Sequence, residues 1–117
     1  MNKRKQQRIE LAALGWRAEL MDQLSGQKLG DIVNLSTSGL MIISSAPVAC
    51  DSLYQVECVT SGPKGQEMRF AIGMQVLWTS PASQVDTQWA GAQIIDISPA
   101  SREALTSLTR EAAKNDN

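Results

Sequence analysis

Short segments in which apolar and polar residues alternate follow one another along most of this chain, and turn-forming residues separate them. Alternation with a period of two places successive side chains on opposite faces of a β-strand. Six short strands at near-regular spacing favour an antiparallel barrel, whose closure removes exposed strand edges. The pattern predicts strands over 14–21, 29–33, 40–43, 53–60, 68–79 and 88–97, with turns at 26–27, 34–39, 61–65 and 80–87.

The pattern changes after residue 97. Ser98 followed by Pro99 fits the N-cap and the first position of a helix. One face of that helix is defined by the spacing of Ser101, Ala104, Leu105, Leu108 and Ala112. The chain has 117 residues, room for one domain. We predict an all-β fold with one helix: a six-stranded antiparallel β-barrel plus a C-terminal α-helix.

The residue counts argue against an enzyme. The chain has no histidine, which excludes Ser-His-Asp and Cys-His machinery and His-ligated metals. Cys50 and Cys58 lack CxxC spacing and are expected to be reduced thiols, at least one of them in the core. No apolar run approaches the ~20 residues of a membrane span, and no signal-peptide pattern follows the start. We expect a cytoplasmic, non-catalytic protein with no metal, no cofactor and no membrane insertion.

The net charge of −1 conceals two opposed parts. Residues 1–10 hold four bases and one acid, a charge of +3, whereas the other seven bases and eleven acids give −4. The acidic body argues against a barrel that binds single-stranded nucleic acid, which needs a broad basic and aromatic groove. We therefore expect no DNA or RNA partner, and the basic start needs its own explanation.

Two short patterns could carry binding chemistry: Arg4-x-x-x-Arg8 and Asn34-x-Ser36-x-x-Gly39. Each alone has an ordinary interpretation. Two arginines four apart are typical of a solvated terminus. Asn, Ser and Gly are typical of a turn, in which Asn and Ser hydrogen-bond to nearby backbone and Gly supplies a positive φ.

Together, in this order and on this scaffold, the two patterns resemble those of the PilZ domain family. That family is recognised by RxxxR before the first strand and [D/N]xSxxG between strands two and three. Asp31–Ser36 is similar to the family's entry into the second motif, and Val76-Leu77-Trp78 to its fifth-strand ending. Gly91-Ala92-Gln93-Ile94 stands where the family has Gly-x-x-Phe, so Ile94 departs from the pattern in a way expected to alter core packing. The resemblance covers roughly residues 4–110.

The resemblance implies a PilZ-like split barrel that binds the bacterial second messenger cyclic di-GMP. Carried over to matching positions, the binding set is Arg4, Arg8, Asn34, Ser36 and Gly39, with Lys5 and Trp78 as further candidates. Arginine suits this ligand because it pairs with phosphate, forks onto the guanine edge and stacks on a base. Asn34 offers an amide, Ser36 a hydroxyl, and Gly39 room for close approach of backbone.

The positions of the remaining large side chains in the pattern indicate their surroundings. Trp78 either stacks on a guanine or is an ordinary barrel tryptophan with a satisfied indole N–H. Trp16 and Trp89 are expected in the core, and Met41, Met68 and Met74 in packing. Arg17 and Arg69 are expected to be solvated.

The predicted organisation is a basic switch segment over 1–13, the barrel and its helix over 14–113, and a polar tail over 114–117. Only three residues precede Arg4, so we expect a stand-alone receptor. Its N-terminal segment would order over the ligand, and the signal would pass to an unidentified effector protein. Motility, biofilm or exopolysaccharide production is the expected output, and the protein is expected to be a monomer or a weak homodimer. The alternative is a PilZ-like interaction module in pilus assembly or motility that binds no nucleotide.

Overall fold

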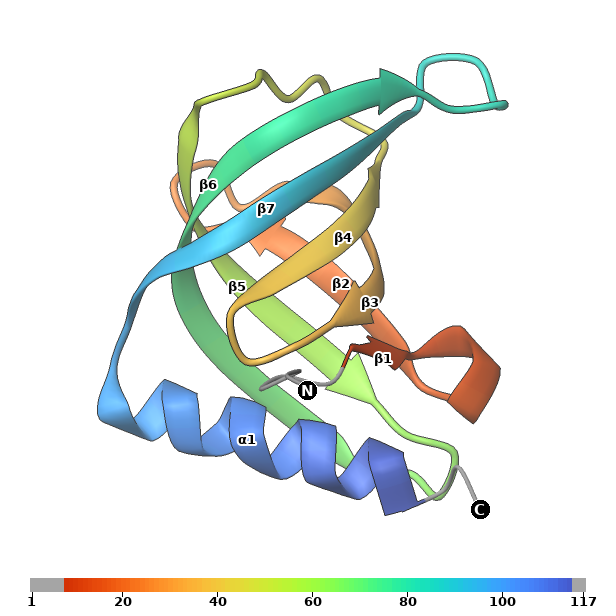
Figure 1. Cartoon of the computed structure of the whole chain (residues 1–117), viewed down its shortest axis with the longest axis vertical. Coiled ribbons are helices and arrows are strands. Elements are labelled where there is room, and N and C mark those ends of the chain that lie inside the picture. The colour runs from red at the N-terminus through yellow and green to blue at the C-terminus, as the bar shows by residue number, and fades with distance from the viewer. Residues whose placement is uncertain (1–7, 115–117) are drawn as a thin grey trace, which may run out of the picture.

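A computed structural model of the chain describes residues 8–114, and its strands close into an antiparallel barrel (Figure 1). Hydrogen-bonded neighbours follow the order β1-β3-β2-β5-β6-β7-β4, and a further pairing of β3 with β4 closes a ring of six strands. The predicted six-stranded barrel is confirmed. The strands are β1 (Ile9–Glu10), β2 (Arg17–Asp22), β3 (Lys28–Leu35), β4 (Gly39–Ser44), β5 (Leu53–Ser61), β6 (Glu67–Pro81) and β7 (Gln88–Ile97).

The short strand β1 lies outside the ring of six. It pairs with the end of β3 that β2 leaves free, through Ile9 opposite Leu35 and Glu10 opposite Asn34. Ile9 and Leu11 are buried in the core, whereas Arg8 and Glu10 are exposed. The C-terminal half of the predicted switch segment is therefore fixed to the barrel by its own apolar side chains.

The first predicted strand begins later than expected. Residues Ala12–Leu14 form a 3₁₀ helix, η1, which Gly15 ends with a left-handed φ of 82°. Leu14 is therefore in a helical turn and only partly buried, so its assignment to a strand was wrong. The alternation of Trp16, Ala18 and Leu20 was correct, because all three are buried along β2 and the residue that precedes it. Trp16 is 1% exposed, as expected of a core tryptophan.

The interior of the barrel is filled by side chains that alternate along the strands, among them Leu20, Ile42, Met74 and Val76. Each fully buried aliphatic side chain contributes about 1.5–3 kcal/mol relative to an exposed one. Trp89 is not in this core, contrary to the sequence prediction. Ala90 and Ala92 of β7 are buried, so the strand's alternation turns Trp89 outward, where it is half-buried.

Two of the four register shifts among the described strands are β-bulges that set which residues of the two motif strands β3 and β6 face outward. One lies in β3 between Ile32 and Asn34, and another in β6 between Val76 and Trp78. A bulge adds one residue to one strand of a pair and shifts the alternation beyond it. Ile32 and Val76 are buried, and the residues that follow each bulge, Asn34 and Trp78, belong to the outer face.

Helix α1 (Pro99–Lys114) lies across one end of the barrel (Figure 1). Ser98 caps it as predicted, because its hydroxyl accepts a hydrogen bond from the Ser101 amide at 3.1 Å. Leu105, Leu108 and Ala112 are fully buried against the barrel. The Ala71 amide of β6 donates to the Ser101 hydroxyl at 3.2 Å, which attaches the first turn of the helix to the sheet. Within residues 8–114, no helix combines the length and the apolarity that a membrane crossing needs.

Candidate functional site

The second motif spans a strand end, a turn and a strand start. Asn34 ends β3 together with Leu35, residues 36–38 form the turn, and Gly39 begins β4. Placing all of Asn34–Gly39 in a turn was therefore wrong at both ends. The buried Ser36 closes the turn, because its hydroxyl accepts from the amides of Ser38 and Gly39 at 3.3 Å each. This bonding is the ordinary turn chemistry of serine.

Gly39 is required for space and not for a left-handed conformation. In the described residues the glycines with positive φ are Gly15, Gly26 and Gly65, so the predicted positive φ at Gly39 was wrong. A Cβ at Gly39 would lie 2.8 Å from the Ala92 carbonyl oxygen of β7. The close approach that this glycine allows is thus between β4 and β7, at the point where the motif enters the barrel wall.

Five residues from five strands lie opposite one another in a single row on the outer face. Consecutive pairs in this row are Glu10–Asn34, Asn34–Met41, Met41–Gly91 and Gly91–Trp78, on β1, β3, β4, β7 and β6. Directly opposed residues of antiparallel strands point to the same face. With strands about 4.8 Å apart, Asn34 and Trp78 are separated by about 14 Å along the curved surface. We call this set of five residues the motif row.

Arg8 contacts the motif row at Asn34. The guanidinium Nη1 donates to the Asn34 side-chain oxygen at 2.8 Å, and this Asn34 side chain is 6% exposed. The structure therefore brings together the second arginine of the first motif and the first residue of the second motif. Arg4 and Lys5, the other basic candidates, lie outside the described residues.

Trp78 is an outer-face residue at the far end of the row. It is 43% exposed, and a Cβ on Gly91 would collide with its indole Nε1 and ring carbons. The indole therefore lies against the backbone of Gly91, which has no side chain to displace it. A flat, half-exposed ring of this kind can stack on a base.

The alternation of the sequence missed two residues of the site. Met41 was assigned to packing, but it faces outward, and its sulfur accepts a weak hydrogen bond from the Asn34 Nδ2 at 3.7 Å. Glu10 accepts from the same nitrogen at 3.4 Å through its Oε2. The signal for Glu10 was present, since residues two apart in an extended segment share a face and Arg8 is two residues away.

The other predictions for large side chains agree with the structure. Met74 is fully buried, Met68 is partly buried against the core, and Ile94 packs against it as well. Arg17 and Arg69 are exposed.

The two cysteines are free thiols in different surroundings. Cys50 is exposed and donates to the Leu77 carbonyl at 3.1 Å, whereas Cys58 is buried. Burial raises the pKa of Cys58 to about 12, helped by the nearby charge of Glu57, so the thiol stays protonated at neutral pH. Cys58 is thus an inert core thiol.

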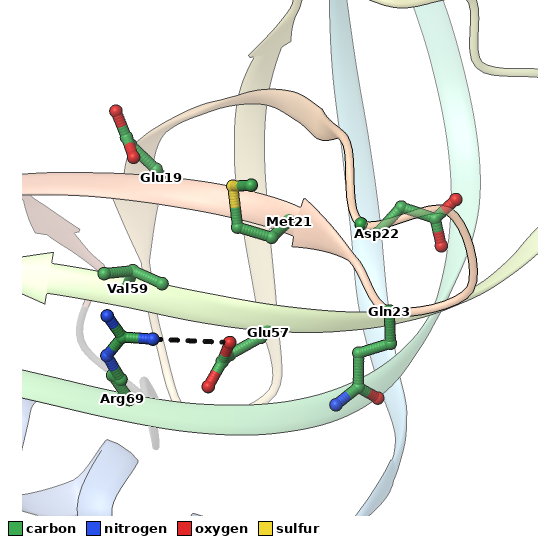
Figure 2. A pocket seen from close by; sticks show the side chains of 8 residues that line it. Glu19, Met21, Asp22, Gln23, Glu57, Val59 and Arg69 are labelled. Atoms are coloured by element: carbon green, nitrogen blue, oxygen red, sulfur yellow. Dashed lines mark ion pairs between the residues drawn. The ribbon is translucent and has the colours of Figure 1, made fainter.

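A different pocket lies on the outer face of β2, β5 and β6 (Figure 2). It has a volume of about 480 Å³, and none of its lining residues belongs to either motif. Three carboxylates line it against one arginine, Arg69, which pairs with Glu57 at 3.7 Å. This acidic pocket does not suit an anionic ligand. Its lining is Glu19, Met21, Asp22, Gln23, Gly26, Glu57, Val59 and Arg69.

Comparisons with known proteins identify the fold. The sequence matches no family model and no curated protein. Solved structures match over the whole chain. The PilZ domain of YcgR from Escherichia coli, described with cyclic di-GMP, aligns with a TM-score of 0.65 and 17% identity over 98% of each chain. This chain has the fold of a PilZ domain.

Two longer proteins contain the same PilZ fold. The Bacillus subtilis inhibitor of motility, MotI, aligns with a TM-score of 0.67 at 11% identity. MrkH from K. pneumonia, described in complex with cyclic di-GMP, aligns with a TM-score of 0.67 at 15% identity. Each alignment covers 100% of this chain, but only 54% of the MotI chain and 57% of the MrkH chain. This chain thus spans about half the length of these two proteins.

Proposed function

We propose that this protein is a receptor that binds cyclic di-GMP at the motif row and breaks no bond. One observation carries the proposal: Arg8 donates to Asn34 at 2.8 Å, which joins the two motifs at one place on the outer face. The YcgR and MrkH structures, which share this fold, are both described with cyclic di-GMP. We take Arg4, Arg8, Asn34, Ser36 and Gly39 as the binding set, with Lys5 and Trp78 as further contacts.

The charges around Arg8 support an anionic ligand. The ion pairs found among residues 8–114 are made by Lys28 and Arg69, so Arg8 has no carboxylate partner there. Its hydrogen bond goes to the neutral amide of Asn34, and the Glu10 carboxylate contacts the nitrogen of the same amide without forming an ion pair with Arg8. A guanidinium in this state can form charge-assisted hydrogen bonds to phosphate or to guanine O6 and N7. Trp78, at the other end of the row, offers a stacking surface for a guanine.

The signal would leave through the N-terminal segment and a partner protein. Ile9 and Leu11 are buried, so ligand-induced ordering concerns residues that precede Ile9 and not the whole range 1–13. MotI is described as an inhibitor of motility, which fits an output in motility or biofilm formation. The free thiols Cys50 and Cys58 fit a reducing compartment, so we place the receptor in the cytoplasm.

Titration calorimetry with cyclic di-GMP tests the proposal. Wild-type protein is expected to bind, and the double variant Arg4→Ala/Arg8→Ala is expected to bind about 100-fold or more weakly, since each charge-assisted bond is worth about 1.5–3 kcal/mol. Arg17→Ala, which removes another exposed arginine, is the matched control and should bind as wild type does. If wild-type protein gives no heat of binding, the proposal is wrong, and the alternative of an interaction module that binds no nucleotide is favoured. Unchanged binding by the double variant would remove the assigned arginine role.

A further inference from the structure

Both ends of the Asn34 side-chain amide have hydrogen-bond partners within the protein. Its oxygen accepts from Arg8 at 2.8 Å, and its nitrogen donates to the Glu10 carboxylate at 3.4 Å and to the Met41 sulfur at 3.7 Å. Arg8 and Glu10 thus hold one buried amide between a cation and an anion. Both hydrogens that Asn34 could offer to a ligand have partners already.

Glu10 also places a negative charge within the proposed ligand site. Its Cα is the direct partner of the Asn34 Cα, so it stands at one end of the motif row. Cyclic di-GMP carries two phosphate charges, which a carboxylate at this position would repel. Binding at Asn34 therefore requires the carboxylate to leave.

The position of Glu10 is fixed by its neighbours and not by the carboxylate itself. Ile9 on one side and Leu11 on the other are buried at 5% and 1% exposure. The Leu11 amide also donates to the Val33 carbonyl at 3.2 Å. The backbone of β1 is therefore held to the barrel, while the exposed Glu10 side chain can swing away by a change of rotamer. The Asn34 amide can therefore lose its bond to Glu10 while β1 stays paired with β3.

We propose that Glu10 is an autoinhibitory latch, which holds the Asn34 amide in the ligand-free protein and is displaced when cyclic di-GMP binds. The inference rests on the function proposed above and adds a residue outside both motifs that sets the affinity of the site. The latch raises the ligand concentration at which the receptor responds. It also disfavours other anions that cannot replace both the bond to Asn34 and the charge of Glu10.

Two substitutions separate the charge of Glu10 from its contact. Glu10→Gln removes the charge and keeps an acceptor for Asn34, whereas Glu10→Ala removes both. By calorimetry at low salt we expect Glu10→Gln to bind cyclic di-GMP about five-fold more tightly and Glu10→Ala about ten-fold more tightly than wild type. At about 0.5 M salt the gain of Glu10→Gln should shrink, because screening removes the repulsion. The further gain of Glu10→Ala should persist.

Glu67→Gln is the matched control. Glu67 is an exposed acid at the start of β6, near the opposite end of that strand from Trp78, and its substitution should leave binding unchanged. Wild-type binding with equal or weaker binding by both Glu10 variants would overturn the latch alone, and weaker binding would show that Glu10 contacts the ligand. Absence of binding by all of these proteins would instead overturn the receptor function, and the latch with it. Thermal melts of the variants show whether each remains folded.

Discussion

The two outer faces of the barrel carry their charges in different ways. On the face of β2, β3, β5 and β6, Lys28 lies 3.3 Å from Glu19 and 3.0 Å from Asp31, and Arg69 pairs with Glu57. On the face that carries the motif row, which we call the motif face, Arg8 donates to the neutral amide of Asn34. Lys28 and Arg69 on the first face are paired with carboxylates, whereas Arg8 makes no ion pair with any of the residues 8–114.

This difference shows why the location of charge matters more than the presence of a pocket. The pocket of Figure 2 has a volume of about 480 Å³, but its arginine is already paired and its other charged groups are acids. Exposed ion pairs of this kind contribute about 0–1 kcal/mol each to the free energy of unfolding, and their charged groups stay in contact with solvent. In the motif row, Arg8 and the Glu10 carboxylate contact opposite ends of the Asn34 amide and do not form an ion pair, and the row ends in a half-exposed tryptophan. A nucleotide with two phosphates and two bases fits the second face better.

The largest effect on stability is expected at a glycine of the motif face. Gly39→Ala would place a Cβ 2.8 Å from the Ala92 carbonyl and force β4 away from β7, at a cost of about 2–3 kcal/mol in unfolding free energy. Gly26→Ala, beside the acidic pocket, has open space but a φ of 76°, and should cost about 1 kcal/mol. Urea unfolding measures both. Equal costs, or a larger cost at Gly26, would contradict the role of close packing at Gly39.

Trp78→Ala should weaken cyclic di-GMP binding about ten-fold, because stacking on an aromatic ring is worth about 1–3 kcal/mol per base. Because the indole is half-exposed, we expect the substitution to change the melting temperature little. Trp89→Ala is the control, since Trp89 also faces outward on β7 but pairs with Ile43 and Ser80, two residues along each strand from the motif row. If calorimetry finds equal affinities for wild type and Trp78→Ala, the indole is a surface residue only.

The smallest effect on stability is expected on the outer face of β2, β3, β5 and β6, which we call the acidic face. The hydrogen bond to Asp31 is the main cause that raises the pKa of Lys28 above its ordinary 10.5, and Glu19 adds to it against the cost of burial. A raised folded-state pKa means that the stabilisation is complete below pH 10.5 and is lost as the pH rises through the folded-state value. Lys28→Met should therefore lower the unfolding free energy by less than about 1 kcal/mol at pH 7, and by less still at pH 11. Cyclic di-GMP binding should not change, and a change there would show that the two faces are coupled.

Much of the fold follows from the alternation of residues along the strands. Ala18 and Leu20 of β2, like Leu105 and Leu108 of α1, are buried as their periodicity predicts. The alternation fails where both parities are apolar or where a bulge intervenes. Met41 stands between the buried Leu40 and Ile42, so hydrophobicity cannot tell which of the three faces outward. The bulges before Asn34 and Trp78 depend on pairing between strands, which no local pattern specifies.

The site was predictable as two motifs but not as a row. Arg8 and Asn34 are far apart in the sequence. Only the pairing of β1 with β3 brings the Arg8 Nη1 to 2.8 Å from the Asn34 Oδ1. The same pairing sets Glu10 against Asn34, which neither motif contains. Gly39 shows the reverse case, since the motif predicts the glycine and its close backbone approach, but the positive φ of an ordinary turn is wrong. Its requirement comes from the neighbouring strand β7 and not from its own φ.

A titration of ¹⁵N-labelled protein with cyclic di-GMP, followed by NMR, tests the central claim most directly. The account predicts that the side-chain amide of Asn34, the backbone amide of Gly91 and the indole N–H of Trp78 shift with increasing ligand. The amides of Gly26 and Glu57, on the acidic face, should stay in place. Shifts confined to the acidic face, or no shifts at saturating ligand, would contradict it.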